Sequence, residues 1–570
     1  IAGQPSGGAT DVAEVFSTYV YDGTAPAGGS GSNTITNGID LAGEGGMVWV
    51  KVRDAVDDHV IWDTERGAFN GLKTSSADGT YNISPDGLTS FNSNGFSLEG
   101  GVTNWNSSSA DYVSWTFRKK EKFFDIVTWT GDGNASQTIS HNLGCAVGVI
   151  MTKLVSGSLG TTGWSVYHRS ANYANRTGAY TTTSAGQNFY TLNSVTSVNN
   201  NSGAWNNTDA TDSVFTVGSN NNILNNTYVG YVYADNSAED AEEQMIKCGN
   251  YTGNGSATGP VVNLGWEPQF VLIKNVANNT NWMMFDSMRG VTTEGVDEYL
   301  YPNSAGSYAT LKSGRGDEDW IDFTATGFKI NINHINVNNT ADDGGHIYMA
   351  IRAPMMVEPE AATDVFAVAA ADSTIPQHNS SFPVDMAMKR NVSVSDGMSI
   401  GARMVGTGRM LSTTTAAETT VANNTWDFMD GWSKQATANA AVYSWMWKRA
   451  KGFMDVVAYT ASSSAAHTVN HSLGVPPELL ISRRRQATMH WYAGQVNNYL
   501  RLNTDGGNLG TPVFNNYTST TYYVTAGTFD AGDETINYLF ASLDGISKVG
   551  SYIGNGSSQT ISCGFSAGSR

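Results

Sequence analysis

The chain is dominated by short segments in which apolar and polar residues alternate, separated by clusters of glycine, asparagine, serine and threonine. Alternation with a period of two is typical of β-strands that bury one face, and Asn-Gly or Asp-Gly pairs are typical of the turns between them. No segment repeats its apolar residues with the helical period over about 11 residues or more. The pattern therefore predicts an all-β fold made of many short strands.

Four strand signatures return along the chain at intervals of roughly 100 residues. An aromatic strand enters a glycine turn, an apolar strand ends in a basic residue, a Trp/Phe-Asp-x-x-Arg-Gly element follows, and two strands close the set. The apolar strands that end in Lys or Arg lie at residues 47–51, 149–153, 270–274, 386–389 and 479–483. A repeated set of this kind predicts a tandem array of antiparallel β-sandwich domains.

The repeats divide the chain into five complete modules and the beginning of a sixth. Modules one and four both open on Ala-Thr-Asp-Val, and modules three and six both carry Lys-x-Gly-x-Tyr before a Gly-Asn-Gly turn. The duplicated unit is therefore a triplet, and we expect the native polypeptide to continue beyond Arg570 and to begin before Ile1. We define modules one to six as residues 10–118, 124–235, 245–353, 363–448, 453–544 and 548–570.

The composition and net charge of the chain exclude several classes of binding partner. The chain has 570 residues and a net charge of −19, so the phosphate backbone of a nucleic acid or an anionic membrane surface would repel it. No run of about 18 apolar residues occurs, and no membrane span is expected. Cys145, Cys248 and Cys563 fall in three different modules, which argues against a structural disulfide framework.

Several motifs occur together with the basic-ended strand and the Asp-x-x-Arg-Gly element. They include Tyr-Val-x-Trp at residues 112–115 and His-x-Leu-Gly at residues 141–144 and 471–474, while module four lacks Asp-x-x-Arg-Gly. The combination resembles a domain repeated in fibre-like structural proteins of tailed phages, many of them from marine hosts. The resemblance implies jelly-roll or lectin-like sandwiches on a virion surface or outside the cell. It also implies a homo-oligomer, usually a trimer, that contacts other virion proteins and a host-surface glycan.

Two tryptophans are the candidate carbohydrate-binding residues. Trp105 and Trp205 lie in loops rich in Asn, Ser and Gly, where an exposed indole would stack on the apolar face of a sugar. The alternative interpretation is that each plugs the end of a sandwich. Four other tryptophans recur near corresponding places and are expected in the core, namely Trp62, Trp164, Trp282 and Trp491.

The basic strand ends and the Asp-x-x-Arg-Gly element have two interpretations. Lys51 with Asp63, and Lys274 with Asp286, would face each other across neighbouring strands as ion pairs. The functional alternative is a recurring site for an acidic sugar. We expect the ion pairs, because opposite charges on adjacent strands are a common way to stabilise a sheet.

Metal binding has weak support in the sequence. His141 and His471 occupy matching positions, but Val262 and Cys563 fill the same position elsewhere, so we expect turn residues and not ligands. Calcium prefers oxygen-rich loops, yet no acidic cluster has the spacing of a recognised calcium loop, and no cofactor is expected. The acidic clusters lie at residues 57–58, 317–319, 342–343 and 530–534.

No motif of nucleophilic, phosphate-binding or metal-dependent catalysis occurs in a convincing context. We therefore expect a protein that is not an enzyme, with three functions in order of preference. The first is a virion fibre or appendage that mediates attachment to the host surface through glycans. The second is a secreted or cell-surface adhesin filament of a bacterium. The third is a polysaccharide depolymerase of the tailspike type, which needs two facing carboxylates.

Overall fold

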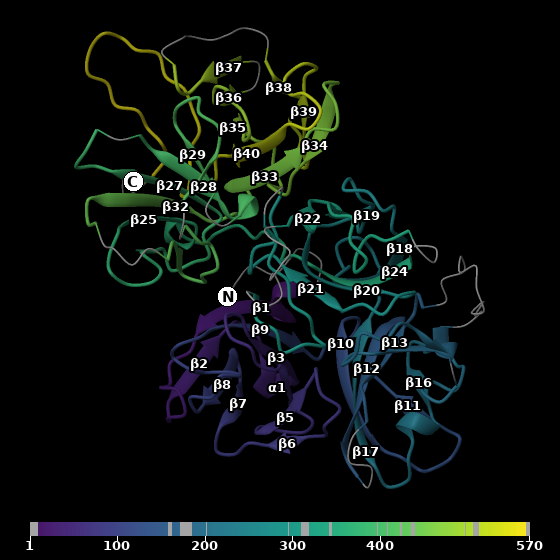
Figure 1. Ribbon diagram of the computed structural model, residues 1–570. Helices are drawn as coiled ribbons and strands as arrows, with labels where there is room; N and C mark the ends of the chain where they lie inside the picture. The colour runs from purple at the N-terminus through teal and green to yellow at the C-terminus, as the bar shows by residue number, and fades with distance from the viewer. Residues whose placement is uncertain are drawn as a thin grey trace. The chain divides into compact units, whose positions relative to one another are not determined.

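The computed structural model describes residues 10–157, 162–171, 185–200, 202–293, 296–308, 318–340, 345–395, 397–406, 409–421, 424–434, 439–495, 498–504 and 512–565. Strands make up nearly all of the described elements, so the predicted all-β fold class is confirmed. Each of modules one to five contains antiparallel sheets, and each named sheet lies within one module (Figure 1). The chain is a tandem array of β-sandwiches.

The strands of the first two modules follow one another without a long helix. Module one contains β1 (Phe16–Asp22), β2 (Ser32–Thr36), β3 (Gly46–Val52), β4 (Val60–Asp63), β5 (Asn70–Lys73), β6 (Tyr81–Asn82), β7 (Gly87–Asn92), β8 (Gly95–Glu99) and β9 (Asp111–Arg118), with the short helix α1 (Leu41–Glu44). Module two contains β10 (Phe124–Thr130), β11 (Ser136–Ser140), β12 (Val147–Ser156), β13 (Ser165–His168), β14 (Asn188–Thr191), β15 (Asn199–Asn200), β16 (Val214–Gly218) and β17 (Thr227–Ala234).

The later modules repeat the same order of elements. Module three contains β18 (Ile246–Thr252), β19 (Val261–Asn263), β20 (Pro268–Asn275), β21 (Met283–Asp286), β22 (Ile321–Thr324), β23 (Gly327–Ile330) and β24 (Gly345–Arg352). Module four contains β25 (Phe366–Ala370), β26 (His378–Asn379), β27 (Met386–Asn391), β28 (Ser399–Ala402), β29 (Arg409–Ser412), β30 (Thr419–Thr420), β31 (Gly431–Trp432) and β32 (Val442–Trp447). Module five contains β33 (Met454–Thr460), β34 (His467–Asn470), β35 (Leu479–Arg484), β36 (Tyr492–Gln495), β37 (Asn498–Arg501), β38 (Phe514–Asn515), β39 (Thr521–Val524) and β40 (Glu534–Phe540).

Short 3-10 helices lie between some of these strands. Those that the structure describes span Val12–Glu14, Ala185–Gln187, Ser219–Asn221, Ala362–Asp364 and Arg403–Val405.

All five modules share one topology. In the larger sheet the last strand of the module lies between the first strand and the basic-ended strand, as in β1-β9-β3-β4-β5-β6 and β33-β40-β35-β36-β37. The smaller sheet pairs the second strand with the strand before the last, as in β2-β8-β7 and β34-β39-β38. Since the strand order repeats, positions in different modules can be matched residue by residue from their pairing partners.

Each module has a core between its two sheets. In module one, Val48 and Val50 of β3 share a buried cluster with Phe96 and Leu98 of β8 and with Trp62 of β4. Module five repeats this arrangement with residues of β33, β35 and β40 packed against those of β34, β38 and β39. Alternate residues of the larger sheet therefore supply the core of each sandwich, as the period-two pattern predicts.

The outer face of the larger sheet is also buried. Every residue of β3 and every residue of β20 is buried, although a sandwich by itself buries only one face of each sheet. Trp49 and Trp115 lie on the outer face of module one and are 1% and 0% exposed. Burying one large apolar side chain stabilises a fold by about 1.5–3 kcal/mol, so the outer faces join modules strongly.

The junction between modules one and two, at residues 117–130, resembles in sequence the junction between modules four and five, at residues 447–460, and the two also match in geometry. Lys120 N donates to Phe124 O at 2.9 Å, and Ala450 N donates to Met454 O at 3.0 Å. The next turn residue has positive φ in both, Lys122 at 62° and Gly452 at 72°. These bonds hold each junction as a tight turn.

The chain forms two compact units. Unit 1 comprises residues 1–289 and 297–355, and therefore almost all of modules one to three; unit 2 comprises residues 290–296 and 356–570. In the described part of the chain, no helix has the length and apolar character needed to cross a membrane.

Candidate functional site

The candidate functional site is the set of buried contacts through which modules one, two and three hold one another in unit 1. It begins with the basic residue near the end of the apolar strand. Lys51, Lys153 and Lys274 occupy the same register position of β3, β12 and β20, and each is at most 1% exposed. Side chains buried this completely are shielded by more than their own module.

Each of these ammonium groups donates to a main-chain carbonyl of a different module. Module two reaches module one, module three reaches module two, and module one reaches module three, so the contacts close into a ring of three sandwiches. The bonds are Lys153 Nζ to Ala77 O at 2.6 Å, Lys274 Nζ to Val195 O at 3.0 Å and Lys51 Nζ to Ala305 O at 3.4 Å.

Burial changes the titration of all three lysines. Removal from water lowers the pKa of Lys274 to about 7, and it lowers the pKa values of Lys51 and Lys153 to about 8. Desolvation outweighs the nearby Asp57 and Asp58 carboxylates, which act in the opposite direction on Lys51. The interior contacts of unit 1 therefore carry groups that lose their charge near neutral pH.

These values predict that unit 1 becomes more stable as the pH rises above about 7. Between that value and 10.5, the unfolded chain keeps a proton on Lys274 that the folded chain has released. One such group raises the free energy of unfolding by up to about 1.4 kcal/mol per pH unit. Thermal unfolding followed between about pH 6.5 and 8.5 measures this rise; tyrosine titrates above this range, and the thiols of the unfolded chain begin to titrate only toward its upper end.

The variant Lys274→Met is expected to remove the part of the rise that lies between about pH 7 and 8, since Lys51 and Lys153 titrate later. Lys329→Met is the matched control, because the Lys329 side chain is 26% exposed in the same module. An unchanged slope in Lys274→Met would contradict the assignment.

A tryptophan directly before the fourth strand makes the second kind of contact between modules. Trp164 Nε1 of module two donates to Lys73 O of module one at 3.0 Å, and Trp282 Nε1 of module three donates to Thr191 O of module two at 3.2 Å. Both indoles are at most 2% exposed. The expectation that they are core residues is confirmed, and the core to which they belong lies between modules.

The Asp-x-x-Arg-Gly element forms an ion pair within its own turn. Arg66 Nε donates to Asp63 Oδ2 at 2.6 Å, and Arg289 Nε donates to Asp286 Oδ2 in the same way, with both module-three side chains fully buried. The turn ends in glycine with positive φ, at 81° for Gly67.

The predicted cross-strand ion pairs of Lys51 with Asp63 and of Lys274 with Asp286 are wrong. Asp63 pairs with Met47 at the opposite end of β3 from Lys51, so the register separates the two charges. Asp286 likewise pairs with Phe270 at the start of β20. Each lysine instead bonds to carbonyls and each aspartate to its arginine, which leaves no exposed charge for an acidic sugar at these positions.

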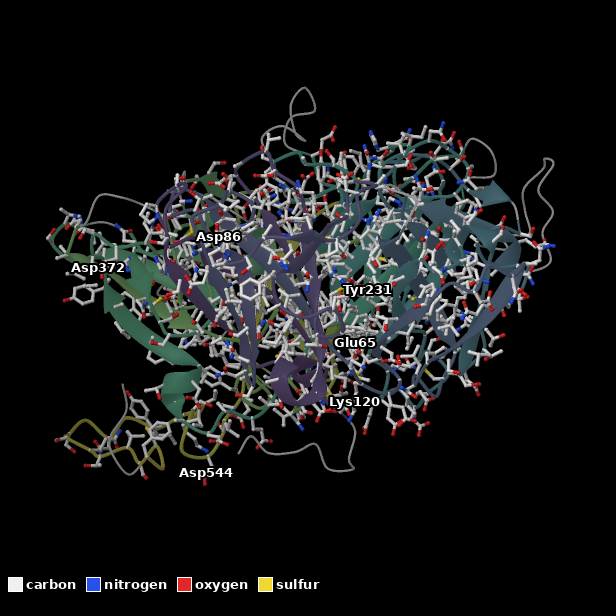
Figure 2. The ribbon with its side chains drawn as sticks, turned by 90° about the horizontal axis from the view of Figure 1, so that it is seen from below. Glu65, Asp86, Lys120, Tyr231, Asp372 and Asp544 are labelled. Carbon is white, nitrogen blue, oxygen red and sulfur yellow. The ribbon has the colours of Figure 1, made fainter. Side chains whose placement is uncertain are left out.

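The same aspartates are also contacts between modules. Tyr231 of module two, labelled in Figure 2, donates its hydroxyl to Asp63 Oδ2 of module one at 2.7 Å. Trp115 Nε1 of module one donates to Asp286 Oδ2 of module three at 3.0 Å. Module two has His168 at this position, and its Nε2 lies 3.0 Å from Tyr348 O of module three. The ring of three modules is thus closed by a second, independent set of bonds.

Sequence reasoning missed this ring, although two signals for it are present. An unbroken apolar run such as residues 47–50 indicates a strand that buries both faces, which an isolated sandwich does not need. A tryptophan placed immediately before a strand, in three modules, also indicates a recurring large contact.

The structure corrects the premise of the carbohydrate-binding prediction. Trp105 is 3% exposed and Trp205 is 1% exposed, so neither presents an indole face to a sugar. Trp105 Nε1 donates to Glu99 O, and its ring packs edge-on against Trp62 at 5.7 Å. The alternative interpretation, that these residues plug the end of a sandwich, describes their positions.

The two matching histidines are parts of turns. His141 Nδ1 accepts a bond from Leu143 N at 3.3 Å, and His471 Nδ1 accepts one from Leu473 N at 3.2 Å. Burial lowers the pKa of both. Among the described residues, no group of three or more His, Cys, Asp or Glu side chains could hold a metal ion.

The acidic clusters that the structure describes bond to protein groups. Asp58 pairs with Lys73 at 2.7 Å, Asp533 with Arg484 at 3.0 Å, and Asp319 accepts from Asn331 at 3.0 Å. Asp317 and the pair at residues 342–343 lie outside the described residues.

Comparison with known proteins identifies one family and no named relative. Residues 11–354 and 379–567 match the family described as Domain of unknown function (DUF7483). No curated protein and no solved structure matches the chain.

Proposed function

Because this chain belongs to the DUF7483 family, whose description names no activity, we propose its function from its architecture: it is a structural protein of a virion appendage. In this proposal it forms a fibre or fibre-like part of a tailed phage and mediates attachment to the host surface through glycans. The observation that carries the proposal is the closed ring of three sandwiches in unit 1, held by buried bonds on every side.

A ring of this kind suits a part that transmits force and sets distance. Its modules contact one another through fully buried charges and indoles. Because such contacts are closely packed and satisfied in one arrangement, they hold the modules in fixed positions relative to one another. Repetition of one topology along a chain is typical of proteins whose purpose is reach and contact. The virion assignment rests on the resemblance of the motifs to repeated domains of tailed-phage fibres. The proposed location, on the virion surface or outside the cell, rests on the same resemblance.

The glycan in this proposal must bind at positions other than Trp105 and Trp205. The loops of the sandwiches are rich in Asn, Ser and Thr, which supply hydrogen bonds to sugar hydroxyls. An array of host-surface glycans, probed with the purified chain, is expected to show binding that free glycan competes away. The variants Trp105→Phe and Trp205→Phe are expected to keep glycan binding. Loss of glycan binding in both variants would show that these residues form the site.

Gold-labelled antibodies against the chain test the location directly. Labelling of an appendage on intact virions, together with inhibition of host adsorption by the purified chain, is the expected result. Labelling of the bacterial surface in uninfected cells would favour the adhesin filament. Release of oligosaccharide from host polysaccharide by the chain would favour the tailspike depolymerase. Sedimentation of the purified chain measures whether copies assemble into the expected homo-oligomer, with a trimer as the arrangement implied by the resemblance.

A further inference from the structure

One module of the five leaves part of the outer face of its larger sheet exposed to solvent, although the rest of that face packs against module five. In each module, one residue of the last strand pairs with the basic residue of the apolar strand. In modules one, two, three and five this residue is at most 1% exposed; the four residues are Val113, Val229, Ile347 and Ile536. The matching residue of module four is Tyr443, which is 38% exposed. Among the described residues, none covers this position of module four as a neighbour covers it in the other modules.

The first strand of the larger sheet shows the same difference. Four modules hold this position at no more than 5% exposed, whereas Val368 of module four is 46% exposed. The four buried counterparts are Thr18, Ile126, Cys248 and Val456.

The register also identifies the basic residue of module four that matches the buried lysines. Arg390 pairs with Tyr443 as Lys51 pairs with Val113, so Arg390 and not Lys389 occupies the ring position. Arg390 is exposed, while Lys51 and its counterpart Arg483 in module five are both 0% exposed. Lys389 instead lies on the inner side and donates to Asn424 Oδ1 at 2.9 Å.

Module five is open at the complementary end. In unit 1, Thr191 at the end of β14 accepts the Trp282 bond of module three, and the next residue, Leu192, is 0% exposed. Leu502 is the matching residue of module five. In module two, Asn193 follows Leu192 and accepts a bond from Trp164 N; in module five, Asn503 follows Leu502 and accepts a bond from Trp491 N. Leu502 is 55% exposed.

Modules four and five already make the contact that modules one and two make. Arg483 Nη1 of module five donates to Thr414 O of module four at 2.9 Å, and Trp491 Nε1 donates to Ser412 O at 2.9 Å. These bonds repeat those of Lys153 and Trp164 in unit 1. Modules four and five therefore repeat two of the three members of the ring, and among the described residues of unit 2, Tyr443 and Leu502 are exposed at the positions that are buried in unit 1.

We propose that a third sandwich of the same fold takes the third position of this ring, and that it is the sandwich begun by module six. Its contacts would be those that module three makes in unit 1: a carbonyl presented to Arg390, as Ala305 is to Lys51, and a large side chain packed on Leu502. Lys548, Tyr552 and the Gly-Asn-Gly turn repeat the residues of β18 in module three.

The described residues 548–565 form no strand, and Tyr552 is 68% exposed. The matching Tyr251 is 7% exposed, because β18 pairs with β24 at the far end of module three. The segment therefore has the sequence of an edge strand without the rest of its sandwich. This inference concerns assembly and holds whether or not the protein belongs to a virion.

Hydroxyl-radical footprinting of the protein from its natural source, beside the 570-residue chain, tests the proposal. In the 570-residue chain, Tyr443 and Leu502 are expected to oxidise readily. In the natural protein, oxidation of both is expected to fall to that of buried Leu192, independently of dilution. Leu224 is the matched control, because it is 57% exposed in unit 1 and should oxidise equally in both samples.

Three results would overturn the proposal. Equal oxidation of Tyr443 and Leu502 in the two samples means that nothing covers the open faces. Protection that disappears on dilution means that a second copy or another chain is the occupant. Protection in a natural protein whose intact mass equals that of the 570-residue chain means that module six does not supply the sandwich.

A chimaera gives an independent measurement of the geometry. Replacing residues 548–570 with residues 247–353 supplies a complete module-three sandwich after module five. Protection of Tyr443 and Leu502 is expected once limited proteolysis shows that the added sandwich resists cleavage. Tyr443→Asp in the same chimaera is expected to expose Leu502 again, whereas the proposal fails if a protease-resistant sandwich leaves both residues reactive.

Discussion

Replacing Arg289 with methionine is expected to lower the free energy of unfolding of unit 1 by about 3–5 kcal/mol. The variant leaves Asp286 charged in a site where both side chains are fully buried. Water cannot enter to solvate the carboxylate, and the bonds it keeps, from Trp115 Nε1 and from its own turn, replace only part of the lost interaction. Urea unfolding, followed by tryptophan fluorescence, measures the change.

Two further variants make this expectation specific. Lys119→Met removes one partner of the pair with Glu65, in which the side chains are 28% and 36% exposed, and should cost about 1 kcal/mol or less. Asp125, which lies 3.6 Å from the Lys119 ammonium group, keeps its bonds from Ile126 N and Asn142 N in this variant. The double variant Asp286→Asn with Arg289→Met removes both buried charges and should recover a large part of the loss. A cost for Arg289→Met no greater than that of Lys119→Met would contradict the burial of this pair.

The second large effect is expected from Trp282→Ala. Removing this indole should lower the free energy of unfolding by about 3–5 kcal/mol, because a cavity opens where the side chain was 2% exposed. The indole lies between modules two and three, so the variant should also free module three from its neighbour. Limited proteolysis is expected to cut the connection at residues 236–244 faster than in the parent chain.

Trp62→Ala is the matched control for this experiment. Trp62 is equally buried but belongs to the core inside module one, so its loss should cost as much stability without faster cleavage at residues 236–244. Trp282→Phe keeps most of the apolar volume and loses the bond to Thr191 O, which should cost about 1 kcal/mol. Equal cleavage in Trp62→Ala and Trp282→Ala would show that Trp282 does not join the modules.

The strands could be predicted because their signal is local. Residues 124–130 and 454–460 form the same edge strand in two modules, as their matching sequences require, and the junction turns before them have the same hydrogen bonds. Alternation of side chains decides which face of a strand is apolar, and a turn residue such as Gly67 decides where the chain reverses.

The candidate site could not be derived in this way, since its contacts join residues far apart in the chain. Lys51 ends a strand near Asp63 in sequence, yet its carbonyl partner Ala305 lies in another module. Trp105 and Trp205 were candidates for surface exposure because their loops are polar, but polar neighbours in sequence do not determine which side chains a sandwich encloses.

By itself the sequence determined the all-β class, the repeat and the positions of the strands that carry the four repeated signatures, because period-two alternation and turn chemistry act between neighbours. Only the tertiary structure decided that three sandwiches close into a ring. It also decided which lysine side chains are buried and which module keeps part of its larger sheet exposed. Those outcomes depend on the second face of the larger sheet. That face is apolar in the sequence, but what covers it depends on surfaces brought together by folding.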